Sequence, residues 1–339
     1  MAADRGLRIA IIGSDTLRGK EIQSVLAARR IPVRSVEFYD PDVQEEYSKL
    51  SQFGDEPKVV HHLDPAMLEG LDLVILAADP RPALDHGHFA SGRDYRTLDL
   101  SESWNDRPDV PVVVAGVNDG LLAGGSVPLA ANPSPAAIML AHLFAPVERA
   151  YGIERAVSVV LEPVSAFEKK GIEELYDQSV AMLGSTAMPK KVFRGQVAFN
   201  LVSHVGRLDS SGFSERERRV LSELRRVLQP GFHLSLSIVL APVFHTYSVM
   251  TYLELKRDTD PAGLRACYMN NPLFDVAAGE KGAVASSVTV AGKDSMAVGP
   301  IKKDSGIPRG FWIWGIADNL TFGSAHNACE LIRTWFKLA

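Results

Sequence analysis

Short apolar runs alternate with helical or polar stretches along the first third of the chain. The runs read LRIAIIG, VRSVEFYD, DLVILAA, DYRTLDL and PVVVAGV, in that order. Between the first two, KEIQSVLAAR places Ile22, Val25 and Leu26 on one face of a helix. This alternation predicts βαβ units, and hence a Rossmann-like, doubly wound parallel sheet at the N-terminus.

The pattern changes near residue 132, at ANPSPAAIMLAHL. Ser134 suits a helix N-cap and Pro135 suits the first helical position. Later strand-like runs read RAVSVVLEPV, HLSLSIVLAPVF and TYSVMTYLEL. The last two alternate polar and apolar residues, which predicts antiparallel strands covered on one face. SERERRVLSELRRVL predicts an exposed amphipathic helix.

These patterns predict an α/β chain with three parts. Residues 1–132 form a Rossmann-like domain, residues 133–317 an α+β domain, and residues 318–339 a helix that packs back on the first domain. The length of 339 residues agrees, because single cores stop growing near ~250–300 residues.

Composition and charge restrict the kinds of partner that the chain is expected to bind. With 46% apolar residues and a net charge of −5, the chain reads as globular and offers no basic surface for nucleic acid. No apolar stretch is long enough for a membrane span, so we expect a cytoplasmic protein without a membrane partner. Only Cys267 and Cys329 occur, and we expect both to be reduced. The histidine pairs lack further ligands at metal spacing, so we expect no metal site.

The run after the first strand resembles a dinucleotide-binding fingerprint. Gly13 and Gly19 occupy its outer glycine positions, but Thr16 stands where the middle glycine lets a pyrophosphate approach. Asp15 adds a carboxylate that competes with a bound phosphate. Asp40, at the end of the second strand, favours a ribose hydroxyl over a 2′-phosphate, so NAD fits better than NADP. A structural turn that binds no ligand explains the same residues, and both interpretations stay open.

An ordered set of strings resembles the aspartate-semialdehyde dehydrogenase family over essentially the whole chain. The strings are LDLVILAA, TLDLSESW, VPVVVAGVN, LAANP, VAFNLVSHVG, LAPVFHTYS and DNLTFGSAHNA. The resemblance implies a Rossmann domain and a second domain that forms a homodimer. It also implies reduction of an aspartyl phosphate by NADPH through a cysteine thioester. In the DNLTFG loop, Asn319 and Gly323 are thereby assigned to the cofactor site.

At most positions where the resemblance implies a catalytic or substrate-binding residue, this chain has a different residue. Pro135 stands at the position of the nucleophilic cysteine, and proline has no nucleophilic atom. Glu162 replaces the glutamine that orients the substrate. Glu217 matches the family's substrate-binding acid, and Arg219 matches a basic residue that holds the substrate phosphate.

The remaining pocket positions lie in LAPVFHTYS. Leu240 replaces the arginine that binds the substrate carboxylate, which removes a bidentate donor. Tyr247 falls at the position of the acid/base histidine, and a tyrosine is a poor proton shuttle at neutral pH. His245 is two residues away, so on a strand both side chains would face the same way.

Three hypotheses follow. The first is a non-catalytic member of the family, a pseudoenzyme that keeps the dimeric frame for binding or regulation. The second is an NAD-dependent oxidoreductase of altered chemistry, which uses Glu162, Glu217, Tyr247 and His245 for proton transfer. The third is a mixed dimer with a true family dehydrogenase.

Overall fold

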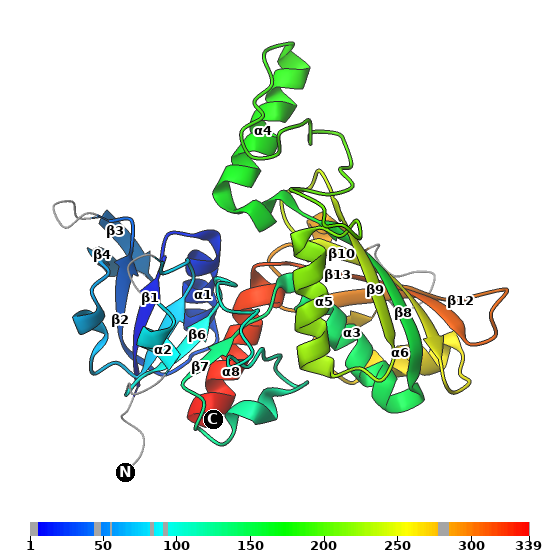
Figure 1. Cartoon of the computed structure of the whole chain (residues 1–339), viewed down its shortest axis with the longest axis horizontal. Helices are drawn as coiled ribbons and strands as arrows, with labels where there is room; N and C mark the ends of the chain where they lie inside the picture. Colours follow the sequence, from blue (N-terminus) through cyan, green and yellow to red (C-terminus); the bar gives the residue numbers. More distant parts are fainter. Residues whose placement is uncertain are drawn as a thin grey trace. The chain divides into compact units, whose positions relative to one another are not determined.

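The computed structural model describes residues 6–43, 49–54, 56–81, 85–90, 94–276 and 285–338. The chain has an α/β fold with two compact units. The first consists of residues 1–134 together with 324–339, and the second of residues 135–323 (Figure 1). The first boundary therefore falls immediately before Pro135.

Seven strands form the sheet of the first unit: β1 (Leu7–Ile12), β2 (Val33–Asp40), β3 (Lys49–Phe53), β4 (Glu56–His62), β5 (Leu73–Leu76), β6 (Arg96–Asp99) and β7 (Leu129–Ala131). Their order across the sheet is β3-β4-β2-β1-β5-β6-β7. All neighbours pair in parallel except β3 and β4. The strand order reverses between β1 and β5, which is where open parallel sheets bind ligands at the carboxyl ends of their strands.

Helices pack on this sheet through apolar faces. α1 (Leu17–Ala28) buries Ile22, Val25 and Leu26, as the periodicity predicts. α8 (Asn327–Phe336) contributes Cys329, Leu331 and other side chains to the same apolar core. The shorter helical segments are α2 (Gly87–Ala90), η1 (Pro65–Leu68) and η2 (Asp119–Leu122).

The apolar run PVVVAGV is not the strand that its composition predicts. Val112 forms only an isolated bridge with Ala131. The amide side chain of Asn118 takes the nearby backbone groups instead: Nδ2 donates to Val112 O, and Oδ1 accepts from Val114 N. The edge strand is β7, which the periodicity did not reveal because it is only three residues long.

Six strands form the sheet of the second unit: β8 (Ile153–Glu162), β9 (His233–Leu240), β10 (Tyr247–Leu255), β11 (Phe274–Val276), β12 (Met296–Lys303) and β13 (Gly310–Ala317). Their order is β11-β12-β13-β10-β8-β9. β10 pairs antiparallel with both β8 and β13, as its alternation predicts. The expectation for β9 was wrong, because β9 runs parallel to β8. Its alternation reflects one-sided burial, which a strand at the edge of a sheet shows in either direction.

The long connection from β8 to β9 carries two helices. α4 (Glu168–Gly184) projects away from the sheet of its unit in Figure 1. The sequence pattern did not predict this helix. Its buried Glu174 accepts three backbone N–H groups, from Lys191, Val192 and Phe193. α5 (Glu215–Leu228) is the predicted amphipathic helix, and it buries Val220, Leu221, Leu224 and Val227.

The remaining helices of the second unit are α3 (Pro135–Tyr151), α6 (Pro261–Met269), α7 (Ser287–Val290) and η3 (Val164–Phe167). α3 is buried along most of its length and contacts α5, α6 and the strands of the sheet. No helix in the described part of the chain is long and apolar enough to cross a membrane.

Candidate functional site

The loop after β1 closes tightly on itself. Gly13 has φ of +82°, and a Cβ there would lie 2.4 Å from Ala78 Cβ. A Cβ on Gly19 would lie 2.2 Å from Gly13 O. Glycine is therefore required at both positions for packing within the first unit. This requirement explains the two outer glycines whether or not a phosphate binds.

Thr16 makes the turn self-sufficient. It is the N-cap of α1: its hydroxyl accepts from Gly19 N and donates to Gly13 O, both at 2.9 Å. In a dinucleotide fold this helix start presents backbone N–H groups to the pyrophosphate. Here the side chain at the middle glycine position has taken one of them.

Asp15 and Asp40 are joined by a cation that the sequence did not reveal. Lys49 Nζ, on β3, lies 2.7 Å from Asp15 Oδ2 and 3.6 Å from Asp40 Oδ2. Its hydrogen bond to Asp15 raises the pKa of Lys49. The ammonium group offsets the negative charge on which the preference for NAD over NADP depends. That preference therefore stays a prediction.

Two further charged side chains near the carboxyl ends of the strands already form ion pairs. Arg18 donates to Leu100 O and forms a 2.8 Å ion pair with Glu102. Asp79 is held by Arg81, whose hydrogen bonds lower the pKa of the Asp79 carboxyl. In contrast, Ser14 Oγ is fully buried and makes no hydrogen bond within the described residues. The backbone turn of this loop thus suits a nucleotide-binding fold. Few hydrogen-bond donors near it remain available to a phosphate.

In the second unit, α3 begins at Pro135, as predicted. A Cβ on Gly323 would lie 2.7 Å from Pro135 Cβ, so the proline ring and the DNLTFG loop are in close contact. The position that the resemblance assigns to a nucleophile is occupied by an apolar ring.

Glu162 is the centre of a buried polar cluster. Its Oε1 accepts from Tyr247 Oη at 2.7 Å and from Arg216 Nε at 2.8 Å. The Arg216 guanidinium lies 4.5 Å from the centroid of the Phe167 ring. Sequence reasoning placed Glu162 and Tyr247 together but missed Arg216, although SERERR contains it. With this arginine present, Glu162 does not bring an uncompensated anion into the pocket.

Leu240 lies at the end of β9 and is 1% exposed. It packs in a small apolar core with Val164, Leu175 and Val197. Its backbone pairs with Val202 in both directions. These apolar neighbours suit a leucine, although Leu240 also pairs in register with Glu162 on β8.

Glu217 forms a second cluster, at the start of α5. It completes a capping box with Ser214, and its other oxygen accepts from Ser237 Oγ and Ile238 N. Burial disfavours the charged form, but the bonds from Ser214 and Ile238 outweigh it and lower the pKa of Glu217. The S-x-x-E spacing of Ser214 and Glu217 is the signature of such a cap. The carboxylate thus has a structural role that the family resemblance did not suggest.

Two other charged residues of α5 have different surroundings. Arg219 forms an exposed i,i+4 pair with Glu215 at 3.2 Å. Glu223 is fully buried, although the sequence analysis treated the charged face of this helix as solvated. Helical periodicity alone did not distinguish this buried carboxylate from the exposed charges of the same helix.

His245 and Tyr247 do not share a strand. β10 begins at Tyr247, and Thr246 between them has φ of +77°. This left-handed residue breaks the alternation, so the argument that both side chains face the same way does not apply. Asn319 Oδ1 accepts from Thr246 N and from Ser165 Oγ, which ties the DNLTFG loop to this turn.

Among the described residues, no group of three or more His, Cys, Asp or Glu side chains is arranged to hold a metal ion. Two sets of polar groups carry the candidate chemistry of the two units. The first unit holds the loop from Gly13 to Gly19 with Asp40 and Lys49. The second holds Glu162, Arg216 and Tyr247.

Known proteins resemble this chain along its whole length. It is 27% identical over 337 residues to the aspartate-semialdehyde dehydrogenase of Aquifex aeolicus (strain VF5), covering 98% of each chain. The enzyme of the same name from Rickettsia bellii (strain RML369-C) is 26% identical over 333 residues, which cover 96% of this chain and 98% of the relative.

Solved structures share the fold. Aspartate semialdehyde dehydrogenase II from Vibrio cholerae, complexed with ASA, superposes with a TM-score of 0.90 at 22% identity, over 98% of this chain and 99% of that one. A probable aspartate-semialdehyde dehydrogenase from Pseudomonas aeruginosa gives 0.89 at 24% identity, with the same coverage. The family model described as semialdehyde dehydrogenase, dimerisation domain, matches residues 144–322. That match covers more than half of the 339 residues, and the chain belongs to the semialdehyde dehydrogenase family.

Proposed function

We propose that this chain is a non-catalytic, dimeric member of the aspartate-semialdehyde dehydrogenase family that acts through binding or regulation. The observation that carries the proposal is Pro135, which begins α3 where the resemblance assigns the nucleophilic cysteine. A thioester needs a thiol, and the proline ring supplies no nucleophile.

Two further positions support the proposal independently. Leu240, with its apolar neighbours, offers no donor for a substrate carboxylate. The Tyr247 hydroxyl is engaged with Glu162 and has replaced the imidazole that would titrate near neutral pH. Since the three losses concern different chemistry, one compensating residue does not repair them.

A direct spectrophotometric assay of the dehydrogenase reaction tests the proposal. The purified full-length chain is supplied with aspartate semialdehyde, phosphate and either NAD or NADP, and nicotinamide reduction is followed by absorbance. We expect no rate above that of the buffer, with an active family enzyme as the positive control. A turnover that scales with protein concentration would refute the proposal.

A homodimer is part of the proposal, and the family model for the dimerisation domain supports it. One face of the second sheet also carries exposed apolar side chains. Val157 and Val159 on β8 are 39% and 41% exposed, and Trp312 on β13 is 38% exposed. Val157 and Trp312 both pair with Tyr252 on the strand between them, so they form one row across the sheet.

Light scattering after size exclusion tests this surface. We expect the unsubstituted chain to elute as a dimer and Val159→Lys to shift it toward monomer, because a charge would enter an apolar interface. A monomeric unsubstituted chain would refute the dimer. The relatives lend no support to a mixed dimer with a second family enzyme.

For the cofactor, we propose that a nicotinamide dinucleotide binds weakly at the loop from Gly13 to Gly19. Gly13 and the topological switch point next to β1 favour binding, while the Thr16 cap opposes it. Asn319 and Gly323 stay proposed contacts of the same cofactor. Calorimetric titration with NAD and NADP measures the affinity of each directly.

The second candidate is an oxidoreductase of altered chemistry. The 2.7 Å bond between Tyr247 and Glu162 favours it, because it joins an acid and a base in a buried site. The proposed group stays Glu162, Glu217, Tyr247 and His245, and Arg216 joins it through its ion pair with Glu162. If Glu162→Gln leaves every measurable turnover unchanged, this candidate fails.

A further inference from the structure

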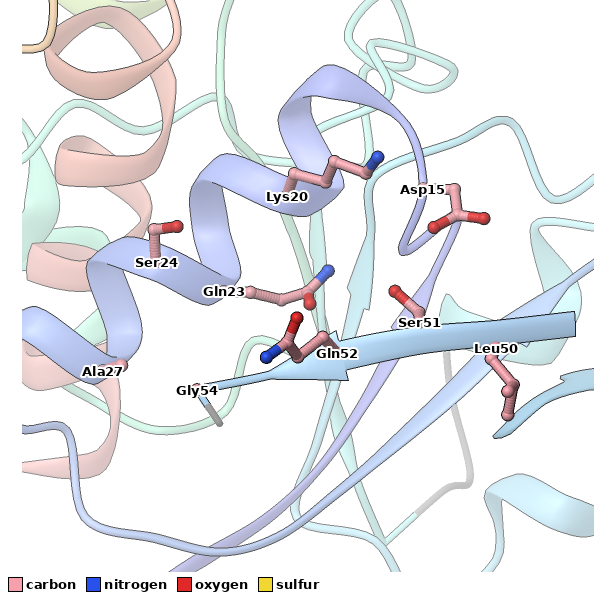
Figure 2. Close-up of a pocket in the computed structure, with 9 residues that line it drawn as sticks. All are labelled: Asp15, Lys20, Gln23, Ser24, Ala27, Leu50, Ser51, Gln52 and Gly54. Atoms are coloured by element: carbon pink, nitrogen blue, oxygen red, sulfur yellow. The ribbon is translucent and has the colours of Figure 1, made fainter. Parts of the chain in front are cut away.

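A groove of about 590 Å³ lies between α1 and the edge strand β3, beside the phosphate loop. Figure 2 shows side chains from the helix on one side and from the strand on the other. The volume is within the ~300–1,000 Å³ typical of small-molecule sites. None of the residues that carry the proposed function of the second unit lines it, so the inference does not depend on that function.

Gln23 offers the groove a fixed hydrogen-bond acceptor. This side chain is 5% exposed, and its Nε2 donates to Ser14 O and to Gly19 O, both at 2.8 Å. An amide nitrogen has only two hydrogens, and a flipped amide would face two carbonyl oxygens with its own oxygen. The bonds therefore fix Oε1 as the atom available to a ligand.

Unused polar groups form the rest of the lining. Within the described residues, the side chains of Lys20, Ser24, Ser51 and Gln52 make no hydrogen bond or ion pair. Lys20 and Asp15 lie near one end of the groove in Figure 2, and Asp15 is already paired with Lys49. Lys20 is therefore the charge at this end that a ligand carboxylate can meet.

The residue types exclude other ligand classes. None of the nine residues that line the groove is aromatic, so no ring is present to stack on a nucleobase. None is arginine, so there is no planar fork for a phosphate. A single ammonium group, a fixed acceptor and several hydroxyl and amide groups remain.

We propose that this groove binds a small zwitterionic amino acid. Its carboxylate meets Lys20, its ammonium group donates to Gln23 Oε1, and a polar side chain reaches Ser51 and Gln52 on β3. The ligand occupies part of the volume of the groove.

Titration of the full-length chain tests the proposal. Each common L-amino acid is titrated by calorimetry, with sodium acetate and methylammonium chloride as probes of the two charges alone. We expect saturable binding of at least one polar amino acid, and no binding of acetate or methylammonium at the same concentration. Binding of no amino acid, or equal binding of acetate, would overturn the proposal.

Two variants locate the binding. Lys20→Gln should raise the dissociation constant by at least about tenfold, which is the loss of one charge-assisted bond. Ser24→Trp should abolish binding because the indole fills the groove from the exposed face of α1. Lys169→Gln, on α4 of the second unit, is the matched control and should change nothing. Melting temperatures verify that the variants are folded. If the tryptophan variant is unfolded, the dissociation constant of Lys20→Gln alone tests the proposal.

A competition experiment separates this site from the cofactor site. Amino-acid binding should persist in the presence of saturating NAD or NADP. Loss of binding under those conditions, or unchanged affinity in both variants, would assign the amino acid to another site and overturn the proposal.

Discussion

The Tyr247 hydroxyl donates a 2.7 Å hydrogen bond to Oε1 of Glu162, and both residues are buried, with 3% of each exposed. The same oxygen accepts from Arg216, so the phenol and the guanidinium together satisfy a buried carboxylate. An acid/base group has to be free to exchange protons with a substrate. Here the bonds favour a fixed structural and binding role.

Tyr247→Phe tests how much this bond stabilises the fold. Removing the phenolic hydroxyl deletes one of the two hydrogen bonds to Glu162 Oε1, so we expect a loss of about 1–2 kcal/mol in the free energy of unfolding. Urea unfolding measures it. Tyr252→Phe is the control: the hydroxyl of Tyr252 is buried without a hydrogen-bond partner among the described residues, and its removal should be nearly neutral. Equal effects in both variants would contradict the argument.

Pro135→Cys should not create activity. The variant gains a thiol at the start of α3, where the helix dipole favours a thiolate, but Leu240 and Tyr247 still lack the chemistry of the substrate site. The dehydrogenase assay described above measures the rate, and iodoacetamide labelling shows whether the new thiol is accessible. Turnover by the single variant would show that the other two positions are dispensable.

Leu240→Arg should destabilise the second unit. Leu240 is 1% exposed in an apolar core, and its register partner Glu162 is already paired with Arg216, so a second buried guanidinium should cost about 3 kcal/mol. Thermal and urea unfolding give the cost, with Leu240→Met as the volume-matched control. If the arginine is tolerated, the pocket is more open than its neighbours indicate.

Glu217→Gln should reduce stability in a pH-dependent way. The pKa of Glu217 is lowered in the folded chain, so its ionised form contributes stability above the unfolded pKa, and that contribution is lost as the pH falls through the folded value. We expect a deficit of ~1–2 kcal/mol at pH 7 from the weakened cap. The deficit should shrink as the solution is acidified below the folded pKa. A deficit independent of pH would contradict a role for the charge.

Lys49→Met tests the link between Asp15 and Asp40. Because Lys49 is 46% exposed, the free energy of unfolding should change by less than ~1 kcal/mol. Two carboxylates lose their counter-ion, so affinity for NADP should fall more than affinity for NAD. Calorimetric titration measures both, with Lys58→Met on β4 as the control. Unchanged affinities in a chain that binds either dinucleotide would exclude a role for Lys49.

Several features of the fold were predictable because they depend on local pattern. The helix at Ile22, Val25 and Leu26 and the amphipathic α5 follow from 3.6-residue periodicity. The start of α3 at Pro135 follows from the fixed backbone angle of proline. β9 was misread because one-sided burial looks the same in parallel and antiparallel edge strands. The family strings added the overall arrangement, which the comparisons support independently.

The order of amino acids establishes which chemical groups are present: a proline, a leucine and a tyrosine at the positions that the family resemblance assigns to a nucleophile, an arginine and a histidine. Their surroundings became known only from the folded structure. It joined Arg216 to Glu162 across 54 positions and Lys49 to both Asp15 and Asp40, and it used Glu217 as a helix cap. The reason is physical: a charged side chain takes its role from the partners within hydrogen-bond distance, and chain folding rather than sequence spacing selects those partners.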